Sequence, residues 1–293
     1  MIKKLFFILL FFNSFFINFS KPTSQQRLLK ELSMVEIKGG YFFFGGYKTK
    51  NSELKYVPGF YICNHKVTNR EYRELLEWCK KNKKMDEYNF LQINFKIKDE
   101  SAKKYGVDED FLKMYFNSSK YDNYPVVCTT YSQKLKYLEL QSLKTGYQHR
   151  LPHDYEFEFL ALEVENPNDG SDFKIIQNKS FDERIKKKCK NYNPLQYFNL
   201  SDPNKINSHK KKSNNYTSYD NYKPNLHNIY DLVGNVFEQC SDVYDKREKV
   251  KIIKGGAFLS DYELLKIENK TPVNIKENRF DVGFRCVIDF CNN

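Results

Sequence analysis

Hydrophobic and polar residues alternate over several short stretches of this chain, and glycines or other turn residues separate these stretches. The segment 35–46 alternates around Gly39 and Gly40, which predicts a strand, a turn and a second strand. Further strands are expected over 57–63, 124–128, 252–258 and 282–289.

Two helices are predicted from their start signals. Thr68 is a good N-cap residue, and Glu71 three positions later completes a capping box ahead of apolar residues at helical spacing. A short helix is expected over 154–162, with acidic residues in its first turns, where they suit the helix dipole. His153 precedes this helix and is interpreted as a surface or capping group.

A further helix is predicted over 132–143. Tyr131, Leu135 and Leu138 fall on one face at helical spacing, and Gly146 follows as a C-cap.

The remaining segments are polar and lack a clear period. Residues 80–123 are interpreted as an insertion of short surface helices, and 166–215 as mostly loop. A chain of 293 residues with 40% hydrophobic and 16% aromatic residues can bury a sizeable core, as one large domain or two small ones.

The charge is basic, with a formal net value of +11. Such a charge could favour nucleic acid, anionic lipid or an acidic polymer. The lysines, however, gather in short runs at 80–84, 186–190 and 210–212, without an arginine-rich helix or zinc-finger spacing. We therefore interpret the runs as solvated loops and expect no nucleic-acid partner.

The N-terminus has the pattern of a secretory signal. Lys3 and Lys4 precede a mostly apolar run over 5–19, which is shorter than a membrane span requires. We expect a signal peptide over 1–20, a linker over 21–34 and an exported protein, in the periplasm, cell envelope or extracellular space. An uncleaved anchor is the alternative, and this segment would then be the only contact with the membrane.

Seven cysteines follow the signal-like segment. An exported chain can form disulfides, but an odd number leaves at least one thiol free or paired with another chain. No CxxC motif occurs, so a zinc site is not expected.

The stretch 225–242, NLHNIYDLVGNVFEQCSD, carries the strongest candidate for a site. Asp231 and Glu238 flank a turn in which Gly234 permits unusual backbone angles. Carboxylates and free carbonyls in a tight loop can hold a hard cation such as calcium. A buried turn whose acids are solvated or paired with other side chains is the alternative.

This stretch resembles the GLYDMxGNVWEW signature of the formylglycine-generating enzyme family, also called the sulfatase-modifying-factor family. Other segments resemble the same family in the same order, and they are VEIKGGYFFFG at 35–45, FYICNHKVTNREY at 60–72, RLPHDYEFE at 150–158, KGGAFLS at 254–260 and DVGFRC at 281–286. The resemblance implies one domain over 35–291.

The resemblance implies an α+β, C-type-lectin-like fold with small sheets and a few helices. It also implies a structural calcium ion, with side-chain oxygens from Asp231 and Glu238 and main-chain oxygens from Gly234 and Val236.

The family's enzyme oxidises a cysteine of sulfatases to formylglycine, with two cysteines that bind copper just after a Gly-Gly strand. Thiolates are the ligands that Cu(I) selects. Here Ser260 stands at the first of these positions and Leu265 at the second. We therefore expect no copper and a non-catalytic member. An oxidase that recruits another thiol, such as Cys240 or Cys286, is an alternative.

The run YPVVCTTYSQ and the insertion before it resemble the gliding-motility and type IX secretion lipoproteins of Bacteroidetes, although no cysteine for a lipid anchor follows the signal-like segment. The resemblance implies an exported structural or binding protein that contacts other envelope or secreted proteins. A calcium-dependent, lectin-like module for a glycan or peptide ligand is a further alternative.

Overall fold

The computed structural model describes residues 24–45, 52–98, 102, 106–161, 216–219, 224–225, 227–244, 249–258, 260 and 262–290. The expected signal peptide over 1–20 and most of the loop expected over 166–215 lie outside the described residues. No helix in the described part has the length and apolar character needed to cross a bilayer.

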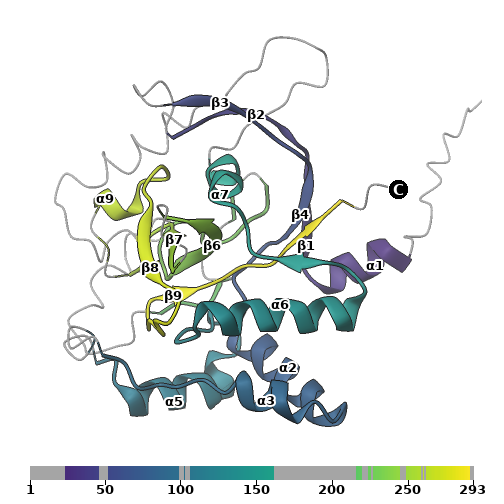
Figure 1. Ribbon diagram of the computed structural model, residues 1–293, viewed down its shortest axis with the longest axis vertical. Coiled ribbons are helices and arrows are strands. Elements are labelled where there is room, and N and C mark those ends of the chain that lie inside the picture. The colour runs from purple at the N-terminus through teal and green to yellow at the C-terminus, as the bar shows by residue number, and fades with distance from the viewer. Residues whose placement is uncertain are drawn as a thin grey trace, which may run out of the picture.

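The described strands form three small sheets (Figure 1). The first has the order β1 (Met34–Ile37), β4 (Phe60–Cys63), β10 (Val287–Asp289) and β5 (His149–Arg150). The second pairs β2 (Gly40–Phe44) with β3 (Glu53–Val57). The third has the order β8 (Thr271–Asn274), β7 (Val250–Lys254), β6 (Phe237–Val243) and β9 (Val282–Gly283).

Helices surround these sheets, and several of them gather at the lower end of the molecule in Figure 1. Their bounds are α1 Ser24–Glu31, α2 Asn69–Lys81, α3 Met85–Phe90, α5 Glu109–Asn117, η1 Ser119–Tyr121, α6 Tyr131–Thr145, α7 Asp154–Ala161 and α9 Tyr262–Leu265. The predicted mixture of small sheets and a few helices is confirmed.

The predicted helix caps at Thr68 and Gly146 are confirmed, because capping depends only on residues a few positions apart in the chain. Thr68 caps α2 and forms the predicted capping box with Glu71. Helix α6 ends at Gly146, whose φ of 79° lies in the left-handed region. The predicted face of α6 was partly wrong, because Leu135 is 43% exposed while Lys134 is buried.

Three predicted elements differ in the structure. The segment 124–128 is no strand, because Cys128 has a φ of 61° and only Pro125 makes an isolated bridge, to Thr68. Strand β7 stops at Lys254, because the two glycines after it both have positive φ. The closing strand is split into β9 and β10 by the residues around Arg285.

Two other segments contribute more structure than we expected. Where the sequence suggested a linker over 21–34, the structure has helix α1, and Leu29 on it is buried. The insertion over 80–123 is not confined to the surface, because Leu112 and Tyr115 of α5 are buried in a cluster of hydrophobic residues. Both segments therefore contribute buried residues to the described part of the protein.

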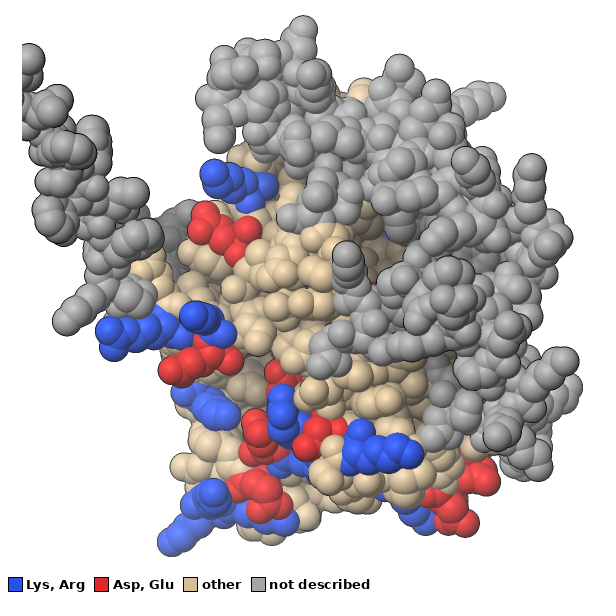
Figure 2. Space-filling view, turned by 180° about the vertical axis from the view of Figure 1, so that it is seen from behind, with Lys and Arg blue, Asp and Glu red and all other residues tan. Residues whose placement is uncertain are grey.

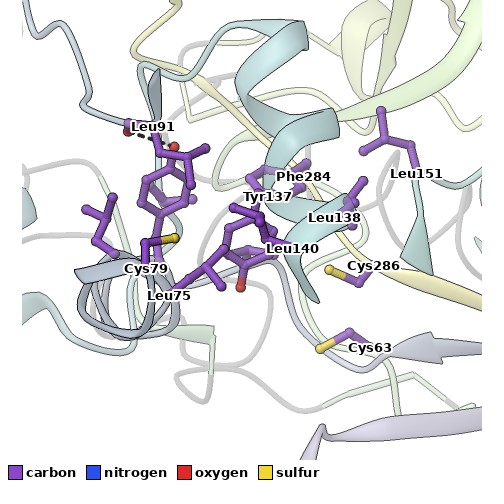
Figure 3. Packing of buried hydrophobic residues seen from close by; sticks show 14 of the residues in the cluster. Cys63, Leu75, Cys79, Leu91, Tyr137, Leu138, Leu140, Leu151, Phe284 and Cys286 are labelled. Carbon is purple, nitrogen blue, oxygen red and sulfur yellow. Dashed lines mark hydrogen bonds between the residues drawn. The ribbon is translucent and has the colours of Figure 1, made fainter. Parts of the chain in front are cut away.

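The main hydrophobic cluster lies between α2, α6 and the sheet of β4 and β10 (Figure 3). The rings of Tyr72 on α2 and Tyr137 on α6 stack with centroids 5.3 Å apart. The Tyr72 hydroxyl donates to the Leu91 carbonyl at 3.0 Å, so its polar end is satisfied inside the core. This cluster fixes the helices against the strand that leads into the candidate site.

Charged side chains on the outer surface are mixed in sign. Figure 2 shows Lys and Arg beside Asp and Glu over the helical part of the molecule. Some of the exposed charges form ion pairs along one helix, such as Lys113 with Glu109 and Lys136 with Glu139.

Lys134 on α6 is a basic side chain that is buried in the protein interior. Its burial should make the stability of the protein depend on pH. Its ammonium donates to the Thr129 carbonyl at 2.7 Å, and burial lowers the pKa of Lys134 to about 7. In the unfolded chain a lysine has a pKa of about 10.4. Between these values the unfolded state binds more protons, so the free energy of unfolding should rise with pH.

We expect Lys134→Met to remove this rise. The difference between wild type and variant should change by up to about 1.4 kcal/mol per pH unit between pH 7 and pH 10. Urea unfolding at a series of pH values measures it. Parallel pH profiles for the two proteins would contradict the prediction.

Candidate functional site

The loop before β6 has the tight backbone that its sequence predicts. Asn228, Asp231, Gly234 and Asn235 all have positive φ, between 52° and 87°. Asn and Asp tolerate such angles better than most residues, and Gly tolerates them best. The Gly234 N–H donates to the Gly255 carbonyl at 2.8 Å, so the loop packs on the end of β7.

Glu238 on β6 is the buried anion at the centre of the site. Both of its carboxylate oxygens accept from Arg285, from Nε at 2.9 Å and from Nη2 at 2.8 Å. Arg285 also donates to the carbonyls of Cys63 at 3.1 Å and Tyr230 at 2.8 Å. Neither Glu238 nor Arg285 is exposed, so a fully buried pair ties β4, the loop and β6 together.

A second buried cation, Lys66, reaches the same carboxylate. Its Nζ lies 3.2 Å from Glu238 Oε1 and 3.5 Å from the Gly234 carbonyl oxygen, and it also donates to the Asp231 carbonyl. The Lys66 side chain is only 3% exposed. The ammonium therefore lies among the oxygens of the loop.

The Asp231 carboxylate is engaged elsewhere. Its Oδ2 accepts from Asn235 Nδ2 at 3.0 Å. The same Asn235 amide donates to the Thr217 carbonyl at 2.9 Å, and Asn235 Oδ1 accepts from the Thr217 N–H at 3.2 Å. Burial raises the pKa of Asp231, against the opposing influence of Lys66.

Burial and neighbouring charges also shift the pKa values of Lys66 and Glu238. Burial lowers the pKa of Lys66, although Glu238 and Asp231 oppose this. Burial alone would raise the pKa of Glu238, but Arg285 and Lys66 bring it below its usual value. With two basic and two acidic side chains, the network balances its charge inside the protein.

Three of the four residues predicted to hold calcium therefore surround one position. Asp231, Gly234 and Glu238 each direct one oxygen at it, although Asp231 does so with its main-chain carbonyl and not with the predicted carboxylate. The Val236 side chain lies in a hydrophobic cluster. The cation at that position is the ammonium of Lys66. Calcium at these residues stays a prediction, and the structure favours the alternative of a buried turn with paired acids.

Lys66 and Arg285 are the residues that sequence reasoning missed. Arg285 lies in a segment predicted as a strand, and Lys66 lies between a predicted strand and a predicted helix cap, so neither was considered as part of a site. A basic residue inside an apolar run, such as Arg285 between Phe284 and Cys286, is a signal for a buried ion pair, because such residues are rarely buried unpaired. The partner, 47 positions away in the chain, could not be read from the sequence.

The positions that correspond to the copper cysteines lie after β7. The Ser260 hydroxyl accepts from the Ala257 N–H at 2.8 Å and is used as a local cap. Leu265 on α9 is 1% exposed and packs on Gly256, where an added Cβ would lie 2.5 Å from Leu265 Cδ2. An apolar side chain thus fills the second position.

Comparison with known proteins identifies the family of this chain. A family model of the sulfatase-modifying factor enzyme 1-like domain matches residues 18–290. The chain belongs to this family. A comparison with curated proteins gave no match.

Solved structures share the family's fold with this chain. PvdO from Pseudomonas aeruginosa has 17% identity and a TM-score of 0.56, covering 88% of this chain and 94% of that chain. CarF has 16% identity and a TM-score of 0.54, with 88% and 98% covered. Treponema denticola variable protein 1 has 13% identity and a TM-score of 0.54, with 88% and 95% covered. The predicted formylglycine-generating-enzyme fold is confirmed.

The five cysteines of the described residues are all buried and none forms a disulfide. Cys63 and Cys286 are neighbours across β4 and β10 (Figure 3), with the Cys63 N–H donating to the Cys286 carbonyl at 2.9 Å. Burial raises the pKa of Cys240 and Cys286 well above the ordinary value, which keeps both protonated at neutral pH. Among the described residues, no group of three His, Cys, Asp or Glu side chains is arranged to hold a metal.

A second polar cluster lies next to Cys63. His65 Nδ1 is 2.7 Å from Asn64 Oδ1, and Nε2 is 3.1 Å from Glu71 Oε1. Burial alone would lower the pKa of His65, but Cys63 and Glu71 beside it raise the pKa well above its usual value. Cys63 Sγ lies 3.8 Å from His65 Nδ1, so the thiol belongs to the same buried polar cluster.

The ion pair of Glu238 predicts a large effect on stability. We expect Glu238→Gln to lower the free energy of unfolding by about 3–5 kcal/mol, because it leaves two buried cations without their counter-charge. Chemical denaturation with circular dichroism measures the change.

Glu109→Gln is the matched control, because it breaks an exposed pair with Lys113 on α5. This variant should unfold at nearly the wild-type denaturant concentration. Equal effects of the two substitutions would refute the central role of Glu238.

Proposed function

We propose that this chain is a non-catalytic member of the family that acts as an exported structural or binding protein. The observation that carries the proposal is the Gly255–Gly256 segment, where Ser260 and the buried Leu265 stand in place of two thiolates. Neither a hydroxyl committed to a main-chain N–H nor an isobutyl group can bind Cu(I) as a thiolate does.

The other thiols support the same proposal. Cys240 and Cys286 are buried, and a protonated, water-free thiol is a poor metal ligand and a poor nucleophile. The alternative of an oxidase that recruits either of them gains no support from these positions.

The partners we propose are other envelope or secreted proteins. The signal-like N-terminus supports export. Figure 2 shows a face of mixed charge, and exposed ion pairs such as Lys80 with Glu77 also mix the two signs. Mixed charge supports protein contacts more than binding to nucleic acid, which favours a continuous basic surface. Association with a gliding or secretion assembly of the envelope is the most specific form of this proposal.

A copper assay tests the catalytic part. We expect wild-type protein, reconstituted with Cu(I) under reducing conditions, to retain no copper on desalting and to leave a Cys-x-Pro-x-Arg peptide unconverted to the aldehyde. Ser260→Cys with Leu265→Cys should gain Cu(I) binding, because it restores two thiolates after the Gly-Gly segment. Metal content and peptide mass are the two readouts.

The single variant Ser260→Cys is the matched control, since one thiolate at this position should bind copper weakly. Aldehyde formation by the wild-type protein would overturn the proposal. Intact mass of the protein from its native envelope, combined with a pull-down, tests export and partners. An uncleaved protein recovered without any envelope component would contradict that part.

A further inference from the structure

We infer that the ammonium of Lys66 is the built-in cation of the loop over 230–238 and takes the place of the calcium ion that the family resemblance implies. An ammonium group has three N–H donors. Lys66 directs them at three oxygens, the carbonyls of Asp231 and Gly234 and the carboxylate of Glu238. Main-chain carbonyls beside a buried carboxylate are the kind of oxygens that a calcium loop also uses.

The ammonium and a calcium ion cannot occupy this position together. Calcium requires about six to eight oxygens at about 2.3–2.6 Å, and the oxygens that would begin such a shell already contact Lys66 Nζ. The remaining predicted side-chain ligand, the Asp231 carboxylate, accepts from Asn235 at 3.0 Å. Calcium could enter only after Lys66 had left.

The charge balance leads to the same conclusion. Lys66 and Arg285 face Asp231 and Glu238 in a region from which water is excluded. A divalent ion added to this balanced set would leave a large uncompensated charge in the interior, which is strongly unfavourable. The single positive charge of Lys66, by contrast, is balanced by the carboxylates of Asp231 and Glu238 that are already present.

The backbone around Lys66 holds its side chain in place. The Asn64 carbonyl accepts from the Tyr230 N–H at 2.8 Å, so this segment is attached directly to the loop. The Val67 N–H donates to the Phe284 carbonyl at 2.8 Å, and the Val67 carbonyl accepts from the Val126 N–H at 2.8 Å. These hydrogen bonds hold both Asn64 and Val67. Because Lys66 lies between them, folding of this segment places its ammonium against the loop.

This inference goes beyond the proposed function, because it makes the loop independent of the calcium concentration around the protein. We expect the wild-type melting temperature to be the same in chelator and in millimolar calcium, and equilibrium dialysis to detect no bound calcium. Calcium bound in a one-to-one ratio by the wild-type protein, or a lower melting temperature in chelator, would overturn the inference.

Lys66→Ala removes the ammonium but leaves the oxygens. We expect this variant to melt at a lower temperature in chelator and to regain on the order of 5 °C when calcium is about a hundredfold above its dissociation constant. Magnesium, which demands a smaller and more regular shell, should restore less. A folded variant without any response to calcium would also overturn the inference, because the oxygens would then not form a cation site.

Lys254→Ala is the matched control. Lys254 is as deeply buried as Lys66 and pairs with Glu158 at 2.7 Å, but it lies outside the loop over 230–238. This variant should lose stability without recovering it in calcium. Recovery of both variants would mean that calcium acts elsewhere in the protein, which would contradict our assignment.

Acetylation of the wild-type protein gives a readout that does not depend on any variant folding. A buried ammonium reacts slowly, so Lys66 should stay unmodified with and without calcium, as judged by mass spectrometry of peptides. Modification of Lys66 only in the presence of calcium would show that the ion displaces it, and the inference would be wrong.

Discussion

The buried ion pair between Glu238 and Arg285 is the interaction on which the rest of the structure depends. It joins the third sheet to the segment between β9 and β10, and through the carbonyls of Cys63 and Tyr230 it also holds β4 and the loop. Lys66 adds a second positive charge to the same carboxylate. In a fold with short strands and limited regular structure, charge-assisted bonds supply the geometry that long hydrogen-bonded ladders supply elsewhere.

Short-range signals in the sequence predicted much of the fold. The capping box at Thr68 and the C-cap at Gly146 depend on residues within a few positions, and both were confirmed. Elements that depend on distant neighbours were predicted less well. The segment 124–128 looked like a strand, but Cys128 is left-handed and only an isolated bridge from Pro125 to Thr68 forms. The face of α6 was misjudged because Lys134 is buried in place of Leu135.

In the candidate site, too, features set by nearby residues were predicted and contacts between distant residues were not. The sequence located the loop around Asp231 and Glu238 and left two interpretations open, a metal site or a turn with paired acids. The second interpretation is favoured by Lys66, which follows β4 and is 165 positions from Asp231 in the chain. Proximity across such a separation is a property of the folded topology, and no pattern in the amino-acid sequence alone could reveal it.

The position of β10 between β4 and β5 has a consequence for how the protein is made. This strand comes from the C-terminal end of the chain, yet it occupies an interior place in the first sheet, and Arg285 just before it completes the ionic centre. While the ribosome is still adding these residues, β4 has one edge without a partner and Glu238 has no guanidinium. The nascent chain therefore completes its first sheet and its ionic centre only after Arg285 and β10 have been synthesised.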